Sequence, residues 1–492
     1  MKKAITIALL TAIILETAAC AGAETKSPNE TSGKGDQTSQ IQSETADPNA
    51  DSLPDNLDFG NAVIKVLFPE SHGGAADQID WVEEDDGDIV NSALFARRTK
   101  VEERLKVKFE VDYSYKVNQW AEALKNSVLA DDKSWDVVWG DQADTIPLSV
   151  EGIYLDLANA DYLDYSKKWW NNDFMDEISI GKKRDLLAGD ISLSMLSYMS
   201  CMYFHKDRFE NISGESADDL YKLVLDGGWT MDKLAEYCRK SYSDLNGSSS
   251  ADEADAYGMG AVTASTTDHM TFDSGIRFTT RDKNGMPELN VVTERSVDFA
   301  KKLYSLFYEN EGVRVYPAVQ QSLRIDIPNK LMNGEMTFMC GYFYSATLLR
   351  DMKADYGIIP YPKLDETIEG YRALVHDSAQ LVSIPITCDK VDAVCAALEA
   401  LAAENYRSVT PAYYETALKT KYIRDDMSGK IVDMIHSSGT TDFAYAYNKS
   451  INSAGLIMRS LMEKNTSDIA STYAGLEAAA KKGLDDLIES SK

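Results

Sequence analysis

The chain has 492 residues, of which 44% are hydrophobic and 26% charged, a composition typical of folded proteins and a length that allows two or three domains. It carries 50 Lys and Arg against 79 Asp and Glu, a formal net charge of −29. Because nucleic acids and anionic lipid surfaces are bound by clustered cations, this balance argues against both as partners. Six cysteines without a C-x-x-C pair argue against a disulfide scaffold and against zinc, iron–sulfur and thiol-redox sites.

The N-terminus has the features of an export signal. Lys2 and Lys3 precede an apolar stretch at 4–15 that is too short to span a bilayer, which needs about 20 residues, so residues 1–19 are predicted to be a signal peptide. The small residues at 17–19 before Cys20 resemble the lipobox of bacterial lipoproteins, although Thr17 stands where Leu is usual. We therefore expect lipid on Cys20 and a flexible, polar tether at 20–58. Plain secretion after cleavage nearby is the alternative.

Strands and helices alternate in the first part of the body. The patterns predict strands at 63–68, 106–111 and 135–139, a helix capped by Asp88 and a helix at 118–130. This alternation is typical of parallel strands joined by crossover helices, with a ligand site beyond the carboxyl ends of the strands. The polar residues 140–144 are expected to form a loop at that place.

The second part mixes short strands with helices. Thr230 is expected to cap a helix at 231–240, and Asn284-Gly285 predicts a β-hairpin because both residues tolerate a positive φ. The remaining expected strands are at 197–204, 336–340, 356–360 and 381–385, and the remaining helices at 296–309, 391–404, 411–421, 427–436 and 468–490.

The sequence has no recognisable catalytic or cofactor motif. H-E-x-x-H, G-x-S-x-G, Walker, G-x-G-x-x-G and EF-hand patterns are missing, and the five histidines are scattered, so we expect no metal and no cofactor. With 79 carboxylates, an acid–base pair of a glycosidase is neither excluded nor located by counting.

Aromatic residues are numerous, with 26 Tyr, 7 Trp and 14 Phe. Aromatic faces match the C–H faces of sugar rings, while carboxylates and amides bind hydroxyl groups. The alternative for any one of these rings is a place in the core. The strongest candidate is Tyr342, at the exit of a predicted strand. The predicted ligand-binding residues are Asp141, Gln142, Trp170, Tyr198, Trp229, Tyr342, Phe343 and Tyr344.

Four blocks of the chain resemble the extracellular solute-binding proteins of ABC importers, in particular the carbohydrate-binding group related to maltose-binding protein. They are DVVW at 136–139 with GIYLDL at 152–157, MYFHKD at 202–207, WTMDKL at 229–234, and LMNGEMTFMCGY at 331–342 leading to YGIIPYP at 356–362. His205 replaces the Asn that is usual in the second block. The likeness runs from Val63 to about Glu404. It implies a type II periplasmic-binding-protein-like α/β fold, with two lobes, crossing hinge strands, a ligand cleft and a helical C-terminal region.

The resemblance also implies a function. We expect a lipid-anchored, monomeric receptor at the outer face of a bacterial cell membrane that binds an oligosaccharide or other sugar, without catalysis, and delivers it to the permease subunits of an ABC importer. The lobes are expected at 59–203 plus 337–404 and at 204–336 plus 405–492. The alternatives are a surface-anchored polysaccharide lyase or glycoside hydrolase, a sensor or adhesin, and a solute-binding protein for a non-sugar ligand.

Overall fold

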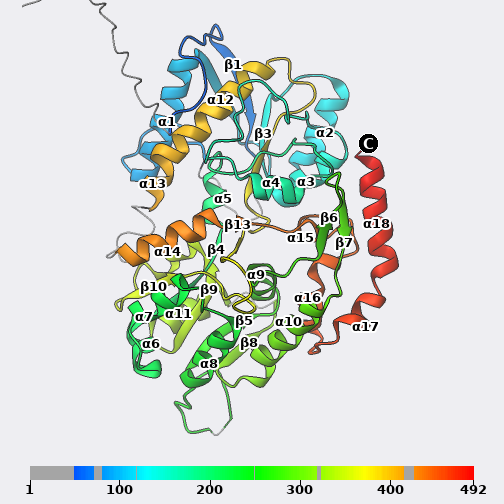
Figure 1. Ribbon diagram of the computed structural model, residues 1–492. Coiled ribbons are helices and arrows are strands. Elements are labelled where there is room, and N and C mark those ends of the chain that lie inside the picture. Colours follow the sequence, from blue (N-terminus) through cyan, green and yellow to red (C-terminus); the bar gives the residue numbers. More distant parts are fainter. Residues whose placement is uncertain are drawn as a thin grey trace, which may run out of the picture. The chain divides into compact units, whose positions relative to one another are not determined.

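The computed structural model describes residues 49–70, 80–117, 119–248, 250–318, 323–414 and 426–491 (Figure 1). The chain divides into two compact units, Met1–Asp47 and Pro48–Lys492, and every described residue belongs to the second. The predicted signal peptide, Cys20 and most of the predicted tether therefore lie outside the described residues. No helix in the described ranges is both long and apolar enough to cross a membrane.

The first sheet is built as the strand–helix alternation predicts. Its strands are β1 (Ala62–Leu67), β2 (Val107–Asp112), β3 (Val137–Asp141) and β12 (Gln380–Ser383), in the order β12-β3-β1-β2, and its crossover helices are α1 (Ile89–Leu105) and α2 (Trp120–Ala130). β1 is parallel to both β2 and β3, and β3 is antiparallel to β12, which comes from much later in the chain. Asp88 caps α1, because its carboxylate accepts hydrogen bonds from the N–H groups of Val90 and Asn91.

The expected loop at 140–144 is not a loop. β3 runs to Asp141, and α3 (Gln142–Val150) begins at the next residue. The reason is a local cap: the Asp141 carboxylate accepts a hydrogen bond from the N–H of Asp144 at 3.1 Å. The sequence pattern showed the polar residues, but it did not show that one of them starts a helix.

The second sheet has mixed pairing. Its strands are β4 (Ser200–His205), β5 (Tyr257–Val262), β8 (Val313–Tyr316), β9 (Met336–Tyr342) and β10 (Tyr356–Ile359), in the order β10-β4-β9-β5-β8. β4 is antiparallel to β9 and β10, whereas β5 is parallel to β9 and β8. The helices along this part of the chain are α6 (Lys206–Ser213), α7 (Ala217–Leu225), α8 (Met231–Ser241), α9 (Ser265–Asp273), α10 (Glu294–Tyr304) and α11 (Leu323–Met332).

This pairing corrects the expected lobe boundaries. The division at 203/204 and 336/337 would put most of β4 and β9 with the first sheet. Instead β9 pairs with β5, for example Phe338 with Met259, and β10 pairs with β4, so both return strands belong to the second sheet. The chain passes to the second sheet through α5 (Leu193–Ser197) and returns to the first between β10 and β12. Such long-range pairing leaves no local signal in the sequence.

The C-terminal region is helical, as expected. α12 (Val391–Glu404) packs against α1 (Figure 1). The predicted helix at 468–490 is divided at Gly475, and the predicted helix at 411–421 lies mostly outside the described residues. The elements after α12 are η4 (Asn405–Val409), α13 (Thr410–Tyr413), α14 (Asp426–Ser437), β13 (Gly439–Thr440), α15 (Phe443–Ala446), η6 (Ala454–Leu456), α16 (Ile457–Glu463), α17 (Ile469–Ala474) and α18 (Glu477–Ser490), and β13 pairs with β11 (Ala373–Leu374).

Two local expectations have clear outcomes. The hairpin forms around Asn284-Gly285, between β6 (Thr279–Arg281) and β7 (Pro287–Leu289). The tether, expected to reach residue 58, is shorter than that: Asp51 accepts hydrogen bonds from Arg104 at 2.7 and 2.8 Å, and Leu53 is buried. An ion pair and an apolar anchor hold this end of the segment against the folded body.

Candidate ligand-binding site

One edge of the second sheet gathers aromatic side chains. β4 and β9 are antiparallel, with Ser200 opposite Tyr342, so the start of β4 and the end of β9 lie at the same edge. Tyr198 precedes β4 by two residues, and Tyr344 follows β9 in the 3-10 helix η3 (Phe343–Leu349). Three tyrosines that are far apart in the sequence are thereby brought together.

Tyr198, Tyr342 and Tyr344 form what we call the tyrosine cluster. The rings of Tyr342 and Tyr344 are stacked, with centroids 5.3 Å apart and planes inclined by 12°. Tyr198 lies 5.9 Å from Tyr342 and 5.0 Å from Tyr344, in edge contact with both. The His376 ring stacks on Tyr198 at 5.8 Å and meets Tyr342 edge-on at 5.2 Å.

His269 on α9 contacts Tyr342 of the cluster. Its Nε2 and the Tyr342 hydroxyl are 3.0 Å apart, within hydrogen-bond distance. Burial lowers the pKa of His269 well below its usual value, since desolvation penalises the charged imidazolium. Burial also raises the pKa of Tyr342 well above its usual value. Both partners are therefore neutral at physiological pH, and the contact is a hydrogen bond and not an ion pair.

The segment 375–380 joins this edge to the first sheet. On one side the N–H of His376 donates to the carbonyl of Tyr198 at 3.2 Å. On the other side the side-chain amide of Gln142, at the start of α3, donates to the carbonyl of His376 at 2.8 Å, and the Gln142 N–H donates to Ala379. The tyrosine cluster and the carboxyl end of β3 thus share one connecting segment.

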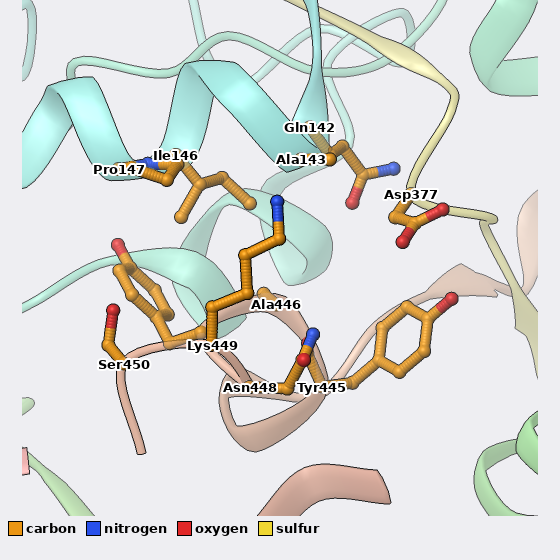
Figure 2. A pocket seen from close by; sticks show the side chains of 11 residues that line it. Gln142, Ala143, Ile146, Pro147, Asp377, Tyr445, Ala446, Asn448, Lys449 and Ser450 are labelled. Carbon is orange, nitrogen blue, oxygen red and sulfur yellow. The ribbon is translucent and has the colours of Figure 1, made fainter. Parts of the chain in front are cut away.

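A small pocket opens beside that segment (Figure 2). It is bounded by the start of α3, by Asp377, and by α15 with the turn at 447–450. Its volume is about 30 Å³, and a site needs roughly 10–15 Å³ to hold one water molecule. The pocket therefore has room for about two water-sized groups and not for a sugar ring.

An ion pair lies near the pocket and the cluster. Asp268 on α9 is buried and pairs with Arg459 on α16. Burial raises the pKa of Asp268 to about 6, against the opposing effect of the Arg459 charge. Within the described ranges no group of three or more His, Cys, Asp or Glu side chains is placed to hold a metal ion.

Four of the predicted site residues meet here: Gln142, Tyr198, Tyr342 and Tyr344. Asp141 lies next to them and acts as the cap of α3. Asp141, Gln142 and Tyr198 are buried, whereas Tyr342 and Tyr344 are partly exposed. Each of these residues stands at a strand end, where the sequence analysis placed the ligand site.

The other three predicted residues are in the core. The Trp170 indole N–H donates to the Glu399 carboxylate at 2.9 Å, and the Trp229 indole N–H donates to the carbonyl of Pro360 at 2.9 Å. Phe343 has no exposed surface, although it stands between two cluster tyrosines. Both indoles have used their only donor inside the protein, so we do not assign a ligand contact to these three residues.

Sequence reasoning missed several residues of this region. His269 and His376 were among the scattered histidines, and Asp377, Tyr445 and Lys449 were not singled out. No spacing pattern joins them, because they come from α9, the connecting segment, α15 and the turn after α15. The available signal was the aromatic run FAYAY at 443–447, which is followed directly by the polar residues Asn448 and Lys449.

No protein-family model matches the chain, and no curated protein matches it by sequence. Its fold is similar to a cyclic α-maltosyl-1,6-maltose binding protein from Arthrobacter globiformis, with a TM-score of 0.56 and 14% identity over 87% of this chain and 100% of that one. It is also similar to an ABC transporter solute-binding protein from Thermotoga lettingae bound with α-D-tagatose, with a TM-score of 0.53 and 12% identity over the same shares.

A third similar structure is UgpB from Mycobacterium tuberculosis in complex with glycerophosphocholine, with a TM-score of 0.53 and 12% identity over 87% of this chain and 100% of that one. Each of these three matches spans the complete length of the similar chain, and they agree with the two α/β sheets and the helical C-terminal region described above. The chain therefore has the type II α/β fold of the solute-binding proteins of ABC transporters.

Proposed function

We propose that the protein is the substrate-binding component of an ABC importer and captures an oligosaccharide or another sugar at the tyrosine cluster. The observation that carries this proposal is the stacked pair Tyr342 and Tyr344 with Tyr198, at a strand-end edge that is joined to the first sheet by residues 375–380. Phenol rings offer flat apolar faces for the C–H faces of a sugar, and their hydroxyl groups remain polar.

Binding at this place requires movement. The cluster rings contact one another and the adjoining pocket holds only about two water-sized groups, so the ligand enters when the two sheets separate. The segments that cross between the sheets are the natural hinges for such a motion. A ligand that contacts both edges binds the closed arrangement better than the open one, and this difference in affinity drives closure.

The neighbours support a sugar ligand. The similar structures include proteins bound to α-D-tagatose, to maltotriose and to acarbose. The glycerophosphocholine-bound neighbour supports a second candidate, a small polar non-sugar solute, so that compound belongs in any ligand panel.

A thermal-shift panel with the protein lacking residues 1–20 tests the proposal. The panel contains maltotriose, cellotriose, xylotriose, mannotriose and glycerophosphocholine. A ligand at 100 times its Kd stabilises the folded state by about 2.7 kcal/mol, which is a measurable rise in melting temperature. Stabilisation by at least one sugar is the expected result. Stabilisation by glycerophosphocholine alone would assign a non-sugar ligand, and no response to any saccharide would contradict a sugar receptor.

We further propose that binding is not followed by chemistry. The cleft of such a receptor needs only affinity to work, whereas a lyase or hydrolase would use the same aromatic rings to present a bond for cleavage. A stabilising oligosaccharide should be recovered at its original length after long incubation with stoichiometric protein. Accumulation of shorter fragments would favour the surface-anchored enzyme.

A sensor or adhesin would bind the sugar without supporting its uptake. Loss of sugar uptake on deletion of the protein therefore separates an importer component from these roles.

The remaining parts of the proposal concern location and partners. Lipid on Cys20 and the polar tether would keep a monomeric receptor at the outer face of the membrane, within reach of permease subunits. What supports this is the signal peptide and lipobox-like sequence at the N-terminus.

A further inference from the structure

The pocket beside the tyrosine cluster is rich in hydrogen-bond acceptors. The Gln142 amide gives an N–H to the carbonyl of His376 at 2.8 Å, and the Asn448 amide gives an N–H to the carbonyl of Tyr445 at 2.8 Å. Each contact fixes the orientation of the amide and leaves its oxygen as an acceptor. The carboxylate of Asp377 adds two further acceptor atoms at the same pocket, one of which, Oδ1, lies 3.0 Å from Nδ1 of His376.

One cation faces these acceptors. Lys449 stands in the turn after α15, and Figure 2 shows its ammonium group extending into the pocket toward Gln142. In the part of the chain that the structure describes, this ammonium group has neither a hydrogen bond nor an ion pair. The neighbouring Arg459, by contrast, is paired with Asp268. Lys449 is an exposed residue at the rim of the pocket, and its ammonium group offers three N–H donors to a ligand that enters there.

Asp377 connects the pocket with the tyrosine cluster. Burial is the main cause that raises the pKa of Tyr445, and the Asp377 charge is the next. The Asp377 charge also contributes, after burial and Tyr344, to the raised pKa of Tyr342. Asp377 lines the pocket together with Tyr445, and the preceding residue, His376, stacks on Tyr198 and meets Tyr342 edge-on. A ligand stacked on the cluster would reach the pocket with its next unit.

We infer that this pocket is a second subsite, in which Lys449 and Asp377 bind two adjacent hydroxyl groups of an uncharged sugar unit. A hydroxyl group both accepts, here from the ammonium, and donates, here to the carboxylate, so it satisfies both sides of the pocket. The volume of about 30 Å³ fits two hydroxyl-sized groups, which is the edge of a ring and not a whole ring.

The same arrangement disfavours charged units. A carboxylate on the sugar would face Asp377 and two amide oxygens and would have no proton to donate to them. An ammonium on the sugar would face Lys449. The inference rests on the proposed function, because it assumes that the cluster holds the neighbouring sugar ring.

The test uses calorimetric titration with whichever of maltotriose, cellotriose or mannotriose binds the wild-type protein best, since their hexose units carry the C6 hydroxymethyl group that one arm of the test oxidises. Hydrogen bonds to charged groups contribute enough that Lys449→Met and Asp377→Asn should each weaken binding about 10- to 100-fold. The control is Lys464→Met, which removes the same charge from an exposed position after α16 and should leave the affinity unchanged. The same trisaccharide oxidised to a carboxylate at C6 should bind at least 10-fold more weakly than the neutral form. Melting temperatures of all variants show that they are folded.

The outcomes separate the inference from the proposed function. If Tyr342→Ala weakens binding while Lys449→Met and Asp377→Asn match the control, the second subsite is wrong and the sugar receptor stands. If the C6-oxidised form binds more tightly than the neutral one, the pocket is an anion site and the inference is overturned. If no neutral trisaccharide binds, both the receptor and the subsite fail.

Discussion

Position at a strand end, and not residue type, separates the aromatic residues that line the site from those in the core. Trp170 and Trp229 have their indole N–H groups bonded inside the protein, whereas Tyr342 and Tyr344 remain partly exposed at the end of β9. Phe343, between them, is the first residue of η3 and has no exposed surface. The sequence showed the aromatic run at 342–344, but only the backbone direction decides which of its rings are exposed.

Substitutions at the cluster should separate binding from folding. If a sugar stacks on Tyr342, Tyr342→Ala should cost about 1–3 kcal/mol of binding, roughly a 5- to 150-fold higher Kd. Tyr342→Phe is the matched control, since it keeps the ring and removes only the hydroxyl that contacts His269. Phe343→Ala should instead cost about 3–5 kcal/mol of stability and leave the affinity of the folded protein unchanged. Calorimetric titration and urea unfolding measure the two effects. Wild-type affinity in Tyr342→Ala would remove the cluster from the site.

The buried carboxyl group of Glu399, on α12, should make the stability of the protein depend on pH. Burial raises the pKa of Glu399 to about 7 from a usual value of 4.5. Between these two pH values the folded state keeps a proton that the unfolded state has released, so the contribution to stability falls as pH rises through this window. Glu399→Gln removes the charge and keeps an oxygen for the Trp170 indole.

The substitution should therefore raise the free energy of unfolding at pH 8 by about 1–3 kcal/mol and change it little at pH 4.5. Urea unfolding at both pH values provides the measurement. Glu103→Gln, at an exposed position on α1, is the control for loss of one negative charge. Equal effects of both substitutions at pH 8 would show that burial of Glu399 does not cause the fall in stability with rising pH.

At the level of elements, local patterns predicted what is local. The strand–helix alternation through β3, the caps at Asp88 and Thr230 and the hairpin at Asn284-Gly285 are all present in the structure. β5 and β8 were missed, because the glycine-containing YGMGAV and the four-residue VRVY carry weak strand signals. The order of the strands was also beyond the sequence, since β9 and β10 find their partners across long stretches of chain. The same limit applies to the site, where Tyr198 and Tyr342 meet only through this pairing.

The β6–β7 hairpin is held by a close backbone approach that a point substitution can test. Gly285 has a φ of +80°, and a Cβ atom there would stand 2.7 Å from the carbonyl oxygen of Gly181. Gly214 has a similar φ of +75° with nothing within 4 Å, so it is a matched control for the conformation alone. Gly214→Ala should cost about 1–2 kcal/mol of stability, and Gly285→Ala should cost clearly more. Equal losses of unfolding free energy in the two variants would show that the close approach to Gly181 does not contribute to the effect of Gly285→Ala.

At the level of the whole molecule, two sheets share one chain that crosses between them through α5 and again between β10 and β12. The chain returns to the second sheet's side after α12, where α14 packs against β10 and α16 packs against α9. In the proposed receptor these crossing segments are the hinges of closure. The packed residues around Asp51 and Leu53 add a further constraint, because they fix the point at which the N-terminal segment leaves the body. Any tether therefore acts over the residues between Cys20 and this point.

Lipid on Cys20 would decide whether the protein partitions with membranes. If Cys20 carries lipid, each buried methylene contributes about 0.8 kcal/mol, and two acyl chains give stable anchoring that the acidic protein surface does not supply by itself. Cys20→Ser should move the protein from the detergent-rich phase to the aqueous phase in a phase-separation experiment on expressing cells. Cys388→Ser is the matched control, since Cys388 is a free cysteine of the folded body and should leave partition unchanged. Detergent-phase partition of Cys20→Ser at the wild-type level would show that the anchor lies elsewhere. Aqueous partition of the wild-type protein would instead favour plain secretion, with cleavage near but not at this cysteine.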